Sequence, residues 1–121
     1  MSYFLFLDDK REVFDIYKNT PYEWMTAKCY SSFKDVIESF GPPIFVSFDH
    51  DLHDEHYIGY KKDLEGNDYI DYSKFKHKTG VDCAKWLVEY CEKNNRDLPS
   101  YEIHSFNPVG VENIKKVLNA T

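Results

Sequence analysis

The stretch IFVSFDHDL, residues 44–52, decides how this chain folds. Its first half, residues 44–48, is a short apolar run, which is typical of a strand buried on both faces of a parallel sheet. Its second half places two carboxylates and an imidazole, those of Asp49, His50 and Asp51, directly behind that strand. Carboxylates that crowd together raise each other's pKa or need a cation. The stretch therefore predicts a buried strand that ends in a functional site.

Other strand and helix patterns alternate along the rest of the chain. The further strand patterns cover residues 3–7, 23–30 and 101–105. The pattern at residues 23–30 is the weakest and suits an edge of the sheet. The helical patterns cover residues 13–17, 32–40, 79–95 and 107–118. Alternation of strands with helices points to an α/β fold, with a parallel sheet and helices on both of its faces.

Residues 57–78 fit neither a strand nor a helix. Two tyrosine-rich arms flank the turn-forming letters EGND, which predicts an irregular hairpin or flap. We expect a single domain over residues 1–121, in which residues from about 53 to 78 form an insertion after the third strand.

Polar side chains follow three of the predicted strands. In a parallel sheet with right-handed crossovers, all the carboxyl ends lie along one edge, and ligands bind there. The residues in question are Asp8 and Asp9, then Asp49, His50 and Asp51, then His104 and Ser105. We expect these three groups to meet on one rim.

A structural role also accounts for several of these residues. Asp9 can cap a helix, and Arg11 can form a surface ion pair. Thr79 and Asn107 stand where the N-caps of the following helices belong, and His104 can be a core histidine.

Two further features have simple structural explanations. Ser32 is the expected N-cap of the helix at residues 32–40. His53 and His56 have a spacing that suits a metal on a helix, but a solvated loop is the simpler explanation for them.

The composition limits the partners of the chain. A net charge of −6 argues against an extended nucleic-acid groove, while a small nucleotide or an RNA end needs only a local site. Three cysteines without a C-x-x-C pair predict a reduced, cytoplasmic protein. No apolar run suits a membrane span or a signal peptide, so no membrane partner is expected. Nothing in the sequence indicates an oligomeric state.

Four blocks of the chain resemble the signature blocks of the cyclic-phosphate processing receiver domains. They read LFLDDKR, VSFDHDL, KTGVDCAKWLVEYC and IHSFNPVGVENI. This family of small receiver-like proteins occurs in bacteria and bacteriophages, which implies the cytoplasm of a bacterium or of a phage-infected host. The resemblance also implies a flavodoxin-like, doubly wound parallel sheet, shortened to about four strands, with the flap inserted after strand three.

The resemblance to receivers assigns roles to individual residues. Asp8 and Asp9 match the acidic metal pair, and Asp49 matches the phosphate-accepting aspartate. Ser105 lies near the hydroxyl that receivers carry after strand four. A fifth strand with its Lys-Pro pair is not found, which argues against ordinary phosphosignalling.

The activity that the resemblance implies is hydrolysis of a cyclic phosphate, such as a 2′,3′-cyclic nucleotide or RNA terminus, by a cyclic phosphodiesterase-type hydrolase. The expected catalytic residues are His50, His104 and Asp49. Imidazole titrates near neutrality, so the two histidines suit the roles of acid and base, in an order that the sequence leaves open. Tyr57 and Tyr60 of the flap are candidates for stacking on a base.

The carboxylates of the rim would repel a phosphate unless a cation offsets their charge. Hard oxygen ligands favour Mg²⁺ or Mn²⁺ as that cofactor. The expected metal ligands are Asp8, Asp9, Asp49 and Asp51. The expected substrate-binding residues are Arg11, Thr79, Ser105 and Asn107.

A second hypothesis is a non-catalytic receiver-like module that binds a metal, a cyclic nucleotide or a protein partner. It predicts saturable binding of a ligand that is recovered unchanged. A phosphoacceptor receiver ranks third, because the lysine of that family is not found.

Overall fold

The computed structural model describes residues 2–58 and 60–119. Within these ranges, no helix combines the length and the apolar character that crossing a membrane requires.

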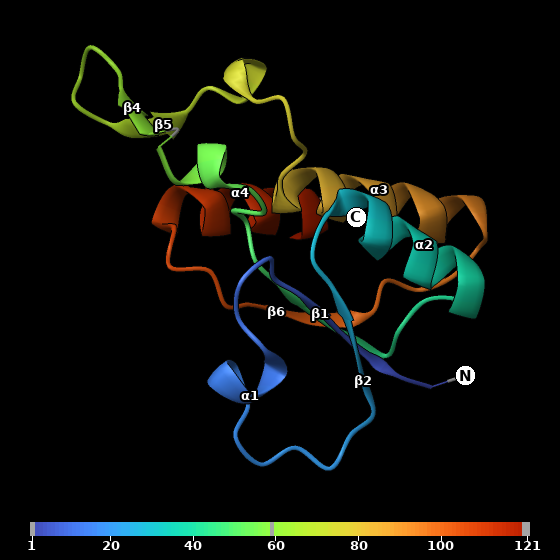
Figure 1. Cartoon of the computed structure of the whole chain (residues 1–121). Coiled ribbons are helices and arrows are strands. Elements are labelled where there is room, and N and C mark those ends of the chain that lie inside the picture. The colour runs from blue at the N-terminus through green and yellow to red at the C-terminus, as the bar shows by residue number, and fades with distance from the viewer. Residues whose placement is uncertain (1, 59, 120–121) are drawn as a thin grey trace.

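Four short strands form one parallel sheet in the order β2-β1-β3-β6 (Figure 1). Their bounds are Phe4–Leu7 for β1, Trp24–Ala27 for β2, Phe45–Phe48 for β3 and Ser100–Ile103 for β6. This order is that of a flavodoxin-like sheet, so the expected fold class is confirmed. The weak strand pattern is indeed an edge strand, β2.

Three helices cover one face of the sheet, while one helical turn lies against the other (Figure 1). The three are α2 (Tyr30–Phe40), α3 (Gly80–Lys93) and α4 (Pro108–Asn119), and the short one is α1 (Val13–Ile16). Helix α3 packs against both α2 and α4. The core between sheet and helices includes the fully buried side chains Leu5, Leu7, Val46, Phe48, Phe33, Ile37, Leu87 and Ile114.

Aromatic side chains cover much of the opposite face, where α1 is too short to do so. The rings of Trp24 and Phe45 each lie 5.2 Å from the ring of Phe4 between them. Tyr17, which directly follows α1, stacks on Trp24 at 5.0 Å. This layer holds the Tyr17 hydroxyl over the centre of the sheet.

Helix α2 begins at Tyr30, earlier than predicted, and its N-cap is Cys29 rather than Ser32. Ser32 is the third helical residue, and its hydroxyl accepts the main-chain N–H of Cys29 at 3.2 Å. Ser32 thus takes the N3 position of a capping box, where Glu or Gln is usual, so the sequence pattern favours Ser32 as the N-cap instead.

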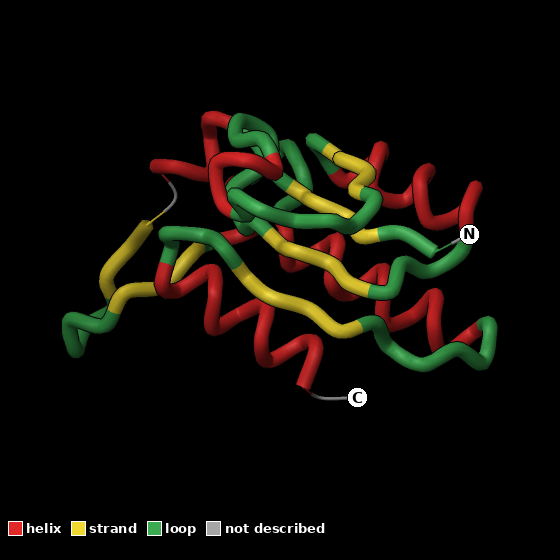
Figure 2. Tube along the Cα trace, turned by 90° about the horizontal axis from the view of Figure 1, so that it is seen from below, coloured by secondary structure: helices red, strands yellow, loops and turns green. Residues whose placement is uncertain are grey.

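The segment between β3 and α3 contains the expected hairpin. Strands β4 (Tyr60–Lys62) and β5 (Asp68–Ile70) pair antiparallel, with a short 3-10 helix on either side, η1 (Asp54–Ile58) and η2 (Tyr72–Lys74). The hairpin projects beyond the main sheet (Figures 1 and 2). Gly66 near its tip has a φ of 84°, a conformation that favours glycine.

Two glycines let helices approach the loop after β3. A Cβ on Gly80 would lie 2.0 Å from the carbonyl oxygen of Asp49, and a Cβ on Gly110 would lie 2.4 Å from the ring of His50. The N–H of Gly80 donates to the carbonyl of His50 at 2.8 Å. The first turns of α3 and α4 therefore hold the loop in place.

Candidate functional site

The carboxyl ends of β1, β3 and β6 bring three ionisable side chains together. One donor atom from each of Asp8, Asp49 and His104 lies within 4.8 Å of the others. The N–H of Asp49 donates to Leu7 O at 3.0 Å, and that of His104 donates to Phe48 O at 2.9 Å. The sheet ladder thus continues past the strands and keeps these residues in register at the rim.

Asp8 is a buried carboxylate whose oxygens accept several hydrogen bonds. Oδ1 accepts the main-chain N–H groups of Lys10 (2.9 Å) and Arg11 (2.8 Å). Oδ2 lies 2.8 Å from Arg11 Nε and 2.9 Å from His104 Nε2. Burial raises the pKa of Asp8, but these hydrogen bonds and the charge of Arg11 outweigh it and lower the pKa to about 2. Asp8 is therefore ionised at neutral pH.

Asp49 is equally buried but far less well supplied with donors. Oδ1 accepts the N–H of His50 at 2.9 Å and lies 3.4 Å from Arg11 Nη2. Oδ2 is buried and has no hydrogen-bond partner among the described residues. Burial and, next, the charge of Asp8 raise the pKa of Asp49 to about 7. A cation bound near Oδ2 would therefore provide the partner that this carboxyl group lacks.

His104 links Asp8 to the face of the sheet that carries α1. Its Nδ1 lies 2.7 Å from Ser47 Oγ, and its ring stacks on Phe6 with the centroids 4.6 Å apart. Ser47 Oγ in turn lies 2.9 Å from the hydroxyl of Tyr17. The side chain of His104 is only 4% exposed. The ring is thus held between Asp8 and Ser47, with little of it exposed.

Tyr17 extends this series of contacts to Glu102 at the surface. Its hydroxyl donates to Glu102 Oε2 at 2.6 Å. Burial and the hydrogen bond to Glu102 raise the pKa of Tyr17 to about 12. The chain Glu102–Tyr17–Ser47–His104–Asp8 thus crosses from the exposed edge of β6 to the rim.

His50, one of the two expected catalytic histidines, lies in the interior of the protein. It is fully buried, with Nδ1 2.6 Å from Asp51 Oδ1 and Nε2 2.9 Å from the hydroxyl of Tyr72. Both ring nitrogens are thus engaged, and Gly110 of α4 packs against the ring. Asn107 completes the network, since its Nδ2 donates to Asp51 Oδ1 at 3.1 Å and its Oδ1 accepts the N–H of Gly110 at 2.8 Å. These contacts join α4 to the loop after β3.

A cavity of about 390 Å³ opens at the rim. Its lining residues are Lys10, Arg11, Asp49, Asp51, Tyr57, Ser105, Phe106 and Asn107. The guanidinium of Arg11 lies 4.9 Å from the centre of the Phe106 ring, which is 87% exposed. The Lys10 ammonium lies 4.5 Å from the Tyr57 ring. The cavity therefore combines two cations, two carboxylates and two aromatic faces.

Two further predicted site residues, Thr79 and Asp9, lie outside this lining, as do Asp8, His50 and His104. Thr79 is fully buried, and its hydroxyl accepts the N–H of Val81 at 3.1 Å as the N-cap of α3, so the structure supports the capping role. The carboxylate of Asp9 accepts the hydroxyl of Tyr57 at 3.1 Å and is not part of the group formed by Asp8, Asp49 and His104. The side chain of Tyr60 lies outside the described residues.

Sequence reasoning missed Lys10 and Phe106 as lining residues, Ser47 as a partner of His104, and Tyr17 as a partner of Ser47. Lys10 and Phe106 are neighbours of predicted site residues in the same loops. Treating every residue of these loops as a candidate would have included them. Ser47 is the polar residue inside the apolar run of β3, where a hydroxyl needs a partner. The distance in sequence from Ser47 to Tyr17 hides their contact.

The donors at the rim fit a divalent cation. Asp8 and Asp49 offer carboxylate oxygens, and His104 offers a ring nitrogen. An ion bound there would also provide a partner for the buried Oδ2 of Asp49. Oxygen ligands of this kind suit Mg²⁺ or Mn²⁺. Asp51 is bound to His50 and Asn107 instead, so with Asp9 it falls outside this ligand group.

A comparison with family models supplies one match. The model described as the cyclic-phosphate processing receiver domain covers residues 3–120 of the 121-residue chain. Neither the curated proteins nor the solved structures include a significant match to the chain.

Proposed function

The chain belongs to the family of cyclic-phosphate processing receiver domains, and on that premise we propose that it hydrolyses a cyclic phosphate in the rim cavity. The substrate class is a nucleotide with a cyclic phosphate, either free or at the end of an RNA. The observation that carries the proposal is the floor of the cavity. There the Oδ2 of Asp49 lacks a donor within the described chain, beside the guanidinium of Arg11.

Arg11 is the group that best suits a phosphate. It is held by Asp8 through Nε at 2.8 Å and by Asp49 through Nη2 at 3.4 Å, so its plane is oriented before a ligand arrives. A guanidinium carries five N–H donors, which leaves donors for phosphate oxygens. Lys10 at the same cavity pairs with the exposed Asp54 and adds a second, more exposed positive charge.

Ser105 and Phe106 suit the rest of a nucleotide. The hydroxyl of Ser105 accepts the N–H of Asn107 at 3.0 Å, which leaves its own proton to donate to a phosphate or sugar oxygen. Phe106 presents an exposed aromatic face at the cavity, and base stacking on such a face contributes about 1–3 kcal/mol. An aromatic face beside a cationic site favours a nucleotide over a cyclic phosphate without a base.

In the hydrolysis, a water oxygen forms a bond to phosphorus and the water loses one proton, one ring P–O bond breaks, and the departing sugar oxygen takes up a proton. A divalent cation held by Asp8 and Asp49 would offset their charge and polarise the phosphate. Arg11 stabilises the charge that grows on the phosphate oxygens. His104 acts as a positioning residue, because it holds Asp8 and scarcely reaches the cavity.

Phosphorus NMR tests the proposal directly. The protein is incubated with 2′,3′- and 3′,5′-cyclic nucleotides and with an RNA that ends in a cyclic phosphate, each with Mg²⁺, Mn²⁺ or chelator. We expect a new monoester resonance, which Arg11→Ala abolishes. Arg96→Ala removes the other arginine of the chain, which does not line the cavity, and serves as the matched control. Unchanged spectra for every substrate would contradict the proposal.

The second candidate function is a binding module without turnover. It is favoured by the placement of the two histidines, since His50 is fully buried and the side chain of His104 is 4% exposed. The cavity lining thus contains no imidazole among the described residues. In the same NMR experiment, a shifted but intact cyclic resonance identifies this function.

A further inference from the structure

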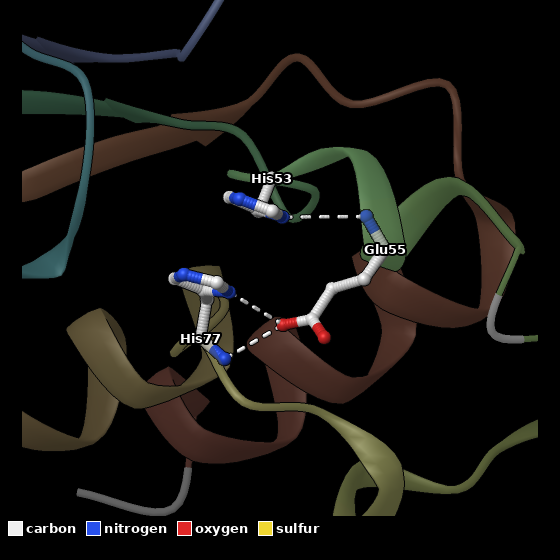
Figure 3. Close-up of side chains that lie close together, drawn as sticks. All are labelled: His53, Glu55 and His77. Carbon is white, nitrogen blue, oxygen red and sulfur yellow. Dashed lines mark hydrogen bonds and ion pairs between the residues drawn. The ribbon is translucent and has the colours of Figure 1, made fainter.

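A second group of metal-binding side chains lies at the base of the flap. His53 precedes η1, Glu55 lies within it, and His77 stands at the far end of the flap before α3. One donor atom from each lies within 4.8 Å of the others. We call these three residues the flap-base cluster (Figure 3). It shares no residue with the lining of the rim cavity.

The two imidazoles of the cluster are arranged as a pair. Their rings stack with centroids 3.7 Å apart and an angle of 9° between the planes. In Figure 3 the His53 ring faces the main chain of Glu55, whose N–H donates to His53 Nδ1 at 3.4 Å, while the His77 ring faces the Glu55 carboxylate. The Nδ1 of His77 lies 3.0 Å from Glu55 Oε2. Both histidines are exposed, which leaves room for the rings to turn out of the stack, as aiming a nitrogen of each at one ion requires.

The backbone under the cluster is held firmly. Glu55 accepts the main-chain N–H groups of Lys76 (3.1 Å) and His77 (2.6 Å). The buried His56 accepts the N–H of Leu52 at Nδ1, so its Nε2 carries the proton that is donated to His77 O at 2.9 Å. The two ends of the flap are thereby joined before any ion binds, which lowers the entropy cost of gathering the ligands.

The charge of the cluster suits a cation. Desolvation raises the pKa of Glu55, but the N–H groups of Lys76 and His77 outweigh it and lower the pKa to about 2. The carboxylate is therefore ionised throughout the neutral range. Two imidazole nitrogens and one carboxylate oxygen form a ligand set typical of Zn²⁺, with the fourth position left for water.

We propose that His53, Glu55 and His77 form a Zn²⁺ site that fastens the base of the flap. The site differs in chemistry from the rim, where oxygen atoms predominate and Mg²⁺ or Mn²⁺ is preferred. An ion bound by both His53 and His77 would join the two ends of the flap. This link restricts the conformations of the flap in the unfolded chain and in partly open states. Tyr57 of η1 lines the rim cavity, so the ion also steadies one wall of that cavity.

The test is a Zn²⁺ titration at pH 7.5 in the presence of excess Mg²⁺, followed by nitrogen NMR of the histidine rings. The readout needs no substrate, so its failure is distinct from a failure of the proposed function. We expect one equivalent of Zn²⁺ to shift the ring nitrogens of His53 and His77 while those of His104 stay unchanged. His53→Ala and His77→Ala should each weaken Zn²⁺ binding by on the order of 100-fold or more.

His77→Ala keeps the main-chain N–H that Glu55 accepts, so it removes the ligand with little effect on the flap. Glu65→Gln, an exposed carboxylate at the hairpin turn, is the matched control and should bind Zn²⁺ as the wild type does. The proposal is overturned if Zn²⁺ shifts only His104, if no histidine responds, or if neither alanine variant changes the affinity.

Discussion

Two carboxylates at the same edge of the sheet have opposite electrostatic environments. Asp8 and Asp49 are both 2% exposed, yet the pKa of Asp8 is lowered to about 2 and that of Asp49 is raised to about 7. The difference lies in the hydrogen bonds, because Asp8 has four, with three residues, and Asp49 Oδ2 has none in the part of the chain that the structure describes. An ionised buried group without donors is destabilising.

Asp49→Asn should therefore stabilise the protein at alkaline pH when chelator is present. The pKa of Asp49 in the folded state lies above its ordinary value of 3.8, so its contribution to stability is greatest at low pH and is lost as the pH rises through about 7. Each pKa unit is worth about 1.4 kcal/mol. From pH 5 to pH 8, urea denaturation should show the free energy of unfolding of the variant rising, relative to that of the wild type, by a few kcal/mol. A difference that does not change with pH would contradict this assignment.

Tyr17→Phe should lower the free energy of unfolding by about 1 kcal/mol and alter the NMR signals of the His104 ring nitrogens. The substitution removes the hydroxyl that joins Glu102 to Ser47, and leaves the buried Ser47 with one partner fewer. Nitrogen NMR of His104 and urea denaturation measure the two effects. Tyr22→Phe is the control, because Tyr22 stacks on Phe4 in the same aromatic layer and is 57% exposed. Equal effects of both substitutions would argue against the chain of contacts.

At the scale of elements, the loop after β3 is shaped by the helices that follow it. The hydroxyl of Thr79 caps α3, the amide of Asn107 accepts the N–H of Gly110 in α4, and both residues are buried. Side chains that sequence patterns place at helix starts thus serve as caps and also support the rim. Only Asn107 of this pair reaches the cavity as well.

Gly110→Ala should destabilise the fold by about 3 kcal/mol or more, as overpacking of a buried contact does. The added Cβ would lie 2.4 Å from the His50 ring, which has little room to move between Asp51 and Tyr72. Gly66→Ala is the comparison, since a Cβ there meets nothing within 4 Å and only the φ of 84° opposes it, at about 1 kcal/mol. Thermal denaturation measures both. Equal decreases in melting temperature for the two variants would mean that α4 does not pack closely against His50.

At the scale of the whole molecule, a chain with a net charge of −6 buries Asp8, Asp49 and Asp51 at the rim, where Asp49 and Asp51 line the cavity. Arg11 lies between Asp8 and Asp49 and offsets part of that charge. A divalent cation at the rim would offset the remainder and would stabilise the folded state by mass action.

Mg²⁺ should raise the melting temperature, and by more at pH 8 than at pH 6, because protons compete for Asp49 near pH 7. Differential scanning fluorimetry with Mg²⁺ and with chelator measures the shift. Asp49→Asn should abolish the shift caused by Mg²⁺, whatever its own melting temperature. Glu38→Gln, an exposed carboxylate on α2, should leave the shift intact. A shift of equal size in Asp49→Asn would place the ion elsewhere.

The sequence by itself determined the order of the elements, the buried strands and the convergence of Asp8, Asp49 and His104 on one edge. These follow from local patterns, because apolar runs and helical periodicity set where strands end, and parallel strands end on the same side.

The tertiary structure alone decided which way the side chains at that edge turn and what they meet. Gly110 packs against the buried His50, His104 contacts Asp8 and Ser47, and His53 stacks on the distant His77. Each of these contacts joins residues far apart in the chain, so its existence depends on how α4, β6 and the flap pack, and no local pattern records that packing.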